Sequence, residues 1–173
     1  MTGLTRGDLA GLVQIATTLV RKVGEKFLRT LTPESKSVVD LQVDGREVKL
    51  AADKALEAEL LAELRTTEIA ILSEETGYIT SDKFPTLLWI VDPLDGSYNF
   101  SRNLGPSMIS VALWEGDTPV LGVLFNLVTK QLSFGGPMLG TYVEDVQAKV
   151  SYRASPAQAT LCTGFPSRFP IDD

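Results

Sequence analysis

Hydrophobic residues recur at helical spacing near the start of the chain. From about Asp8 to Leu31 they fall three or four positions apart and form one apolar stripe, which is typical of an amphipathic helix packed on a core. The Thr-Pro pair at 32–33 ends this predicted helix. A second helix is predicted over about Ala51–Leu64, with its leucines on one side and three glutamates, Glu57 among them, mainly on the other.

Short apolar runs separated by turn residues follow, and they predict β-strands. Asp44-Gly45, between Ser37–Val43 and Arg46–Leu50, indicates a hairpin. The later runs are Ile69–Ser73, Leu87–Val91, Met108–Trp114, Val120–Asn126, Gln131–Gly135, Thr141–Val143, Lys149–Tyr152 and Ala159–Thr163. Because few helices lie between these runs, we predict an α+β fold with helices packed on an antiparallel sheet, and we interpret residues 1–173 as one unit.

Composition and charge narrow the classes of function. The formal net charge of -6 at pH 7 argues against a nucleic-acid partner and against attraction to anionic lipid. The start of the chain resembles neither a signal peptide nor a membrane span, so we expect no membrane association and a cytoplasmic protein. The chain has one cysteine and no histidine, which excludes an internal disulfide and the Ser-His-Asp and Cys-His mechanisms. Carboxylates, hydroxyls, lysine or a hard metal ion must therefore carry any chemistry.

The candidate chemistry lies within Ser73–Phe100. A buried apolar strand, Leu87–Val91, ends at the segment DPLDGS, which contains Asp92 and Asp95. Two carboxylates about 5 Å apart repel each other by roughly 3 kcal/mol at an effective dielectric constant of about 20, so we expect a cation between them. Magnesium prefers oxygen ligands and manganese can replace it.

Neighbouring residues support a site for metal and phosphate together. The carbonyl of Leu94 can be a further ligand, Gly96 lets the backbone approach closely, and Ser97 can open a short helix whose N–H groups face an anion. Asp-Pro and Asp-Gly also form ordinary turns, and DPLDG alone does not decide between the two interpretations. The acidic pair Glu74-Glu75, at the end of another predicted strand, favours the metal site.

These motifs resemble a known family. The pattern SEE, followed after a short gap by WIVDPLDGSYNF, is similar to the signature of inositol monophosphatases and their relatives, which include bisphosphate nucleotidases and fructose-1,6-bisphosphatases. The segments VKLAAD and SVALWEGDTPVLGVLFNLVTKQLSFG also match it. The resemblance implies the first part of a layered α/β/α/β/α fold. It also implies a homodimeric, Mg²⁺-dependent enzyme that hydrolyses a small phosphorylated substrate, with inositol monophosphate as the default. A 3′(2′),5′-bisphosphate nucleotidase, a sugar-phosphate phosphatase and a non-catalytic family member are the alternatives.

The resemblance also assigns metal ligands. It implies that Glu74 holds the first metal ion and that Asp92 bridges the first and the second. The backbone oxygen of Leu94 would join the first ion, and Asp95 would bind the second. Glu75 would lie near the site and support a further, weakly bound ion.

Phosphate and water contacts are implied in the same way. The N–H groups of Gly96 and Ser97 would bind the phosphate, and the Ser97 hydroxyl, paired with Asp53, would orient and deprotonate the attacking water. Simpler roles exist for two of these residues. Asp53 could be a first-turn aspartate favoured by the helix dipole, and Ser97, where the family usually has threonine, could be a helix cap.

One family feature is not found. The family has a later segment containing Trp-Asp that supplies another aspartate to the second metal ion, and no Trp-Asp pair occurs in this sequence. We therefore expect the C-terminal α/β half of the fold to be absent from this chain. A fragment of a longer enzyme, an enzyme whose other half is a separate chain, and a degenerate member without turnover all remain open.

Overall fold

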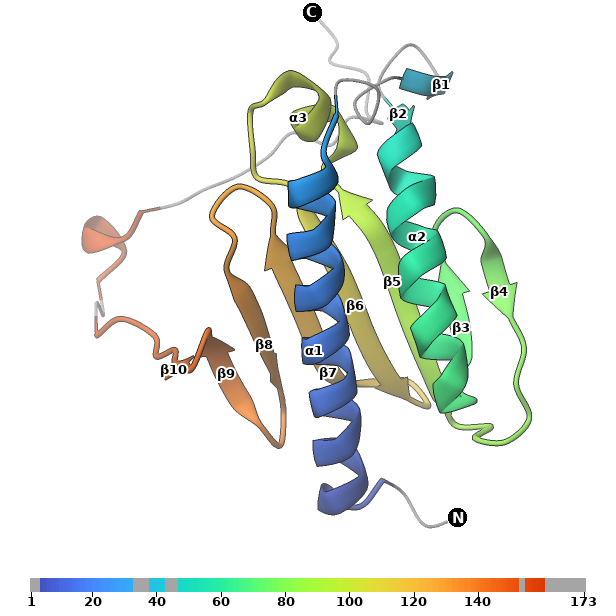
Figure 1. Ribbon diagram of the computed structural model, residues 1–173. Coiled ribbons are helices and arrows are strands. Elements are labelled where there is room, and N and C mark those ends of the chain that lie inside the picture. The colour runs from blue at the N-terminus through green and yellow to red at the C-terminus, as the bar shows by residue number, and fades with distance from the viewer. Residues whose placement is uncertain (1–3, 33–37, 43–46, 153–154, 161–173) are drawn as a thin grey trace, which may run out of the picture.

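Two long helices cover one face of a β-sheet. The computed structural model describes residues 4–32, 38–42, 47–152 and 155–160. Helices α1 (Arg6–Thr30) and α2 (Ala51–Leu64) lie side by side against an eight-stranded sheet (Figure 1). A separate two-stranded hairpin, β1 (Val38–Gln42) and β2 (Glu47–Leu50), leads directly into α2. The predicted α+β class is confirmed.

The sheet is mixed, not purely antiparallel as we expected. Its order is β10-β9-β8-β7-β6-β5-β3-β4. All neighbours are antiparallel except β3 and β5, which are parallel. The strands are β3 (Ala70–Ser73), β4 (Gly77–Ile79), β5 (Leu87–Asp95), β6 (Met108–Glu115), β7 (Thr118–Asn126), β8 (Leu132–Gly136), β9 (Gly140–Val143) and β10 (Val146–Gln147). Strand β4 is the edge strand and runs antiparallel to β3. The loop after β4 crosses back past β3, so β5 pairs with the other side of β3 and runs parallel to it.

The short elements differ most from the sequence-based expectations. Strands β4 and β10 and the 3₁₀ turns η2 (Arg65–Thr67) and η3 (Pro156–Gln158) had no prediction. The strand predicted over Lys149–Tyr152 is wrong, since Val150 and Tyr152 are 91% and 97% exposed and have no sheet to pack on. Part of the strand predicted over Ala159–Thr163, and the turn at Asp44-Gly45, lie outside the described residues.

The core lies between the two helices and the sheet. The sheet contributes Trp89, Ile109, Leu113 and Phe125, all fully buried. Gly24 lets α1 approach the sheet closely, since a Cβ atom there would lie 2.3 Å from the ring of Phe125. The opposite face of the sheet remains partly exposed, with Leu72 and Leu124 each 39% exposed.

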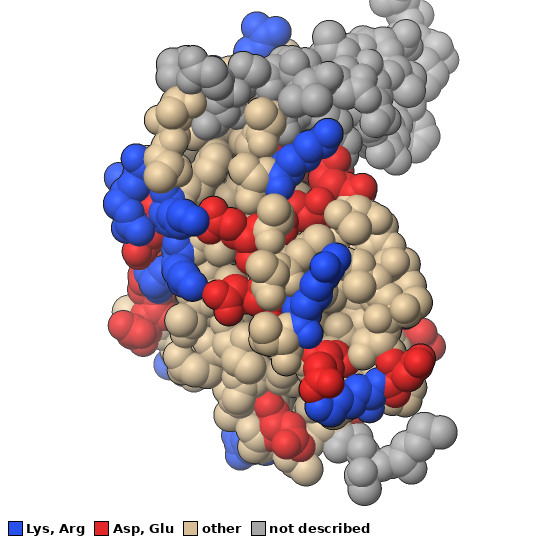
Figure 2. All heavy atoms as spheres, turned by 45° about the vertical axis from the view of Figure 1, so that its right-hand side comes forward, with Lys and Arg blue, Asp and Glu red and all other residues tan. Residues whose placement is uncertain are grey.

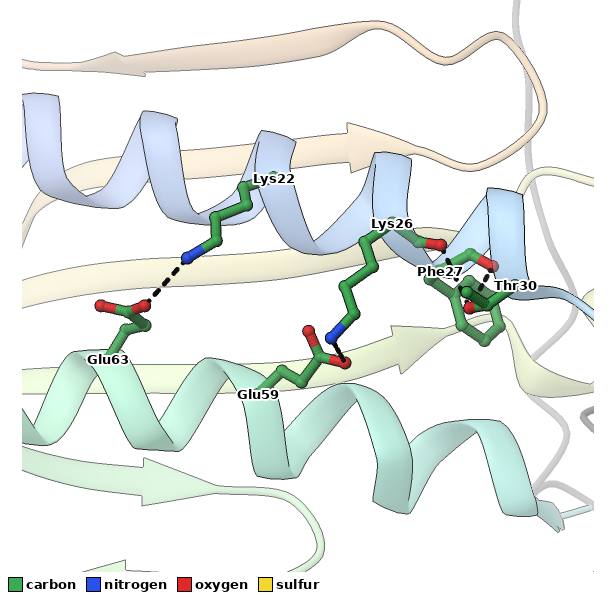
Figure 3. Close-up of polar contacts among 6 residues, drawn as sticks. All are labelled: Lys22, Lys26, Phe27, Thr30, Glu59 and Glu63. Carbon is green, nitrogen blue, oxygen red and sulfur yellow. Dashed lines mark hydrogen bonds and ion pairs between the residues drawn. The ribbon is translucent and has the colours of Figure 1, made fainter.

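Ion pairs bridge the outer surfaces of α1 and α2 (Figure 3). Lys22 Nζ lies 3.0 Å from Glu63 Oε1, and Lys26 Nζ lies 2.8 Å from Glu59 Oε1. Such exposed pairs contribute less than about 1 kcal/mol each, so the buried core holds the helices in place. Figure 2 shows basic and acidic side chains intermixed on the face it displays, without a continuous patch of one sign. In the described part of the chain, no helix has the length and apolar character needed to cross a bilayer.

Candidate functional site

The segment DPLDGS contains the last four residues of β5, the single turn residue Gly96 and the first residue of helix α3 (Ser97–Arg102), so β5 runs past Val91, where we predicted its end. The pairing of β5 with β6 shifts register between Asp92 and Asp95, and within this irregular stretch Asp92 Oδ1 accepts a hydrogen bond of 3.1 Å from the N–H of Leu94. Gly96 has φ = 82°, and a Cβ atom there would lie 2.8 Å from the carbonyl oxygen of Pro106. Glycine is therefore required at this position both by backbone conformation and by the closeness of the neighbouring loop.

Asp53 and Ser97 come from distant parts of the sequence and form a direct hydrogen bond. Asp53 lies in the first turn of α2 and is only 2% exposed. The Ser97 hydroxyl lies 2.9 Å from Asp53 Oδ1 and 2.8 Å from the carbonyl oxygen of Leu94. A hydroxyl carries one proton, so Asp53 and Leu94 share it as acceptors. The hydroxyl oxygen keeps lone pairs for an incoming donor.

Glu74 and Asp92 meet because β3 and β5 run parallel. Ser73 is in register with Val91, and the Glu74 N–H donates to the Val91 carbonyl at 3.1 Å. Carboxyl ends of parallel strands share one edge of a sheet, and both carboxylates lie at this edge. In Figure 1 the same end of the molecule holds the tip of β5, the start of α2 and helix α3.

The electrostatics of Asp92 reflect this crowding. Burial, the charge of Glu74 and its hydrogen bond to Glu74, and the charge of Asp95 raise the pKa of Asp92 from 3.8 to about 7, against a lowering contribution from the Leu94 N–H. Like charges brought together in a partly buried place disfavour ionisation. A cation at this position would relieve the same repulsion.

The residues present fit a magnesium ion. Among the described residues, no group of three acidic side chains has the spacing of a ready metal site. Mg²⁺, however, commonly binds through one or two carboxylates and completes its shell with water and substrate phosphate oxygens. Glu74 and Asp92 supply such a pair, in contact with each other. Asp95 is exposed at the end of β5, and Glu75 is half-buried in the turn after β3.

The sequence analysis missed Glu57. We expected it on the solvated side of α2, whereas it is buried, with 7% exposure. Its carboxylate accepts hydrogen bonds from Ser73 and Thr76, which flank Glu74 and Glu75. The available signal was its spacing of four residues from Asp53, which puts both carboxylates on one face of the helix.

A cavity of about 840 Å³ lies at the other end of the sheet. It is lined by the start of α1, by the start of β5 and by Glu115 at the end of β6. None of the predicted site residues lines it. Because its walls are mainly apolar and carry no acidic cluster, we place the candidate chemistry at the carboxyl ends of β3 and β5 instead.

The sequence is similar to those of several curated proteins. An inositol-1-monophosphatase from Synechocystis is 32% identical over 162 residues, which cover 91% of this chain and 55% of that protein. A fructose-1,6-bisphosphatase from Pyrococcus furiosus is 31% identical over 118 residues, 68% of this chain and 45% of that protein. A protein named Nus factor SuhB from Haemophilus influenzae is 28% identical over 92% of this chain and 60% of its own length. The chain thus spans about half the length of the curated relatives it matches.

Solved structures show the same architecture. The extragenic suppressor protein suhB from Bartonella henselae matches with a TM-score of 0.74 and 25% identity, over 83% of this chain and 55% of that chain. The inositol monophosphatase from Anabaena matches with a TM-score of 0.68 and 27% identity, over 84% of this chain and 52% of that chain. The sequence profile of the inositol monophosphatase family matches residues 8–172. The chain therefore belongs to the inositol monophosphatase family.

Proposed function

We propose that the chain provides the acidic metal-binding part of a Mg²⁺-dependent phosphatase that hydrolyses small phosphate monoesters. The observation that carries this proposal is the contact between Glu74 and Asp92, two carboxylates brought together from separate segments at one edge of the sheet. Family membership supports it, since relatives carry the names of phosphatases. A bound cation would relieve the burial and crowding of charge that raise the pKa of Asp92.

The ligand roles that we propose are those implied by the family resemblance. Glu74, Asp92, Asp95 and the backbone oxygen of Leu94 would hold Mg²⁺, with Mn²⁺ as a substitute. A bound ion would make a water molecule more acidic and neutralise charge on the phosphoryl oxygens. Glu75 lies in the same turn as Glu74 and could support a further, weaker site.

The protein's own groups would bind and orient the reactants. The N–H groups of Gly96 and Ser97 begin helix α3 and would hold the phosphate oxygens. The Ser97 oxygen can accept a hydrogen bond from the attacking water while its own proton points to Asp53. In this proposal the Ser97–Asp53 pair would orient that water and take its proton.

Inositol monophosphate is the substrate we propose first. The relatives named fructose-1,6-bisphosphatase favour a sugar phosphate as the second candidate. A bisphosphate nucleotide is the third candidate, and a non-catalytic chain is the remaining alternative. We also propose a cytoplasmic homodimer, for which the partly exposed apolar face of the sheet is the supporting feature, because monomers rarely leave such a face in water.

The test is phosphate release by the 173-residue chain, with Mg²⁺ and with a chelator. The substrates are inositol 1-phosphate, fructose 1,6-bisphosphate and 3′-phosphoadenosine 5′-phosphate. We expect phosphate release that depends on Mg²⁺. Asp95→Asn should lower this release by more than ~10- to 100-fold, the loss typical of a residue that only supports a metal ligand.

The matched control is Asp117→Asn, which removes an exposed carboxylate from the turn between β6 and β7. It should release phosphate at the wild-type rate. Wild-type activity in Asp95→Asn would contradict the metal assignment, and no release on any substrate by the wild-type chain would contradict catalysis by this chain alone.

A further inference from the structure

Glu57 is a buried carboxylate that the proposed chemistry does not use. It lies on α2, one helical turn after Asp53, and is 7% exposed. A buried carboxylate is costly unless hydrogen bonds satisfy it. Three donors do so: the Ser73 hydroxyl at 2.5 Å and the Thr76 N–H at 2.9 Å from Oε1, and the Thr76 hydroxyl at 2.8 Å from Oε2.

These donors flank the acidic turn on both sides. Ser73 is the last residue of β3, and Thr76 precedes the first residue of β4. Between them lie only Glu74 and Glu75. The Glu57 carboxylate is therefore hydrogen-bonded to both ends of the turn in which Glu74 lies next to Asp92.

Helix α2 fixes a second acidic segment in the same way. Asp53 accepts the Ser97 hydroxyl at the end of DPLDGS, and Glu57, four residues later, holds the turn at 74–76. Two carboxylates on one helical face thus tie both acidic segments to one rigid element. The distance between Glu74 and Asp92 then depends on the helix as well as on the pairing of β3 with β5.

We propose that Glu57 is a positioning residue that sets the metal affinity of the site by holding the turn at 74–76 through hydrogen bonds. This inference rests on the proposed function. It assigns Glu57 no direct contact with a metal ion or substrate. Residues that orient metal ligands in this way typically change metal affinity by about 10- to 100-fold when they are replaced.

Three substitutions test whether Glu57 acts through its hydrogen bonds. Glu57→Gln keeps an oxygen for the Ser73 hydroxyl and the Thr76 N–H, and its amide can donate to the Thr76 hydroxyl oxygen. Glu57→Met keeps much of the volume and removes all three hydrogen bonds. Thr76→Val, at an exposed residue, removes one of them with little risk to folding.

The experiment is calorimetric titration of the 173-residue chain with MnCl₂. We expect Glu57→Met to weaken Mn²⁺ binding by at least about 10-fold, Thr76→Val to weaken it less, and Glu57→Gln to stay within about threefold of wild type. As a second readout, the amide hydrogen of Thr76 should exchange faster in Glu57→Met and not in Glu57→Gln. Gly24→Ala, a change in the contact of α1 with Phe125, controls for general loss of stability and should leave Mn²⁺ affinity unchanged.

Each outcome decides between the assignments. Equal losses in Glu57→Gln and Glu57→Met would show that the charge of Glu57 matters, and would overturn positioning by hydrogen bonds. Unchanged affinity in both Glu57→Met and Thr76→Val, with wild-type binding intact, would overturn the positioning role alone. A wild-type chain that binds no Mn²⁺ would overturn the proposed function and the role of Glu57 with it.

Discussion

At the scale of single residues, the site depends on hydroxyl groups as much as on carboxylates. The Ser97 hydroxyl links the start of α3 to Asp53 in α2, and the Ser73 and Thr76 hydroxyls link the turn after β3 to Glu57. Each hydroxyl donates to a buried carboxylate. These contacts satisfy the carboxylates and at the same time fix the chain segments that carry Glu74 and Asp92.

Replacement of Ser97 tests this double role. Ser97→Ala removes a donor from buried Asp53, so the free energy of unfolding should fall by about 1 kcal/mol in urea titrations. Phosphate release should fall by about 10²- to 10⁴-fold, the usual effect of losing a group that directs proton transfer. Ser97→Thr retains the hydroxyl and should restore both quantities. Undiminished phosphate release in Ser97→Ala would mean that Ser97 takes no part in the reaction.

At the scale of elements, the close approach of α1 to the sheet depends on one glycine. Alanine is normally preferred to glycine inside a helix by about 1 kcal/mol. At Gly24 the added methyl group would lie 2.3 Å from the ring of Phe125, which is fully buried in β7. At Gly11, on the same helix, no atom lies within 4 Å of the added Cβ.

The two glycines should therefore respond in opposite directions. We expect Gly24→Ala to lower the free energy of unfolding by about 1–3 kcal/mol, because it overpacks the contact between helix and sheet. Gly11→Ala should raise it by up to about 1 kcal/mol through helix propensity alone. Chemical denaturation of both variants measures the difference. Stabilisation by Gly24→Ala would show that α1 lies farther from β7 than the structure indicates.

At the scale of the whole molecule, an ion pair links α1 to the part of the sheet formed by β8 and β9. Arg21 Nη2 in α1 lies 2.7 Å from Oε2 of Glu144, which follows β9. The Glu144 side chain also accepts a hydrogen bond from the N–H of Leu132 at the start of β8. These contacts lower the pKa of Glu144 below its usual value of 4.5. The hydrogen bond from Arg21 contributes most, and the hydrogen bond from the Leu132 N–H is second. The neighbouring Asp145 belongs to the same groove between α1 and β8.

This pair gives stability a defined dependence on pH. Because the pKa of Glu144 is lower in the folded than in the unfolded state, its stabilisation is present above pH 4.5 and is lost as the pH falls through the folded value. We expect Glu144→Gln to lower the free energy of unfolding at pH 7 and to lower it less at acid pH, where the carboxylate becomes protonated. Urea unfolding at a series of pH values from 7 downward measures this free energy. The control is Glu63→Gln, which removes the exposed partner of Lys22. A deficit in Glu144→Gln that does not shrink with acid would contradict this assignment.

Local patterns were sufficient to predict the two long helices and the turn at Gly96, although β5 extends to Asp95, beyond its predicted end at Val91. The apolar spacing gave α1 to within two residues and α2 with the bounds observed, because a helical face is set by residues a few positions apart. The segment DPLDGS likewise carries its own turn chemistry, in the Asp92 side chain and the conformation of Gly96. The strand predicted over Lys149–Tyr152 was wrong, since an apolar run forms a strand only where its backbone can pair with a neighbouring strand.

The tertiary structure alone decided how these parts meet. The parallel pairing of β3 with β5 places Glu74 beside Asp92, and strand pairing depends on residues far apart in sequence that no local pattern specifies. The burial of Glu57 also depends on distant residues. The sequence predicted a solvated helix face there, whereas the hydroxyl groups of Ser73 and Thr76 donate to the carboxylate and offset the cost of burying it. The sequence by itself thus determined which residues are candidates for the chemistry, whereas the long-range contacts determined their distances and partners.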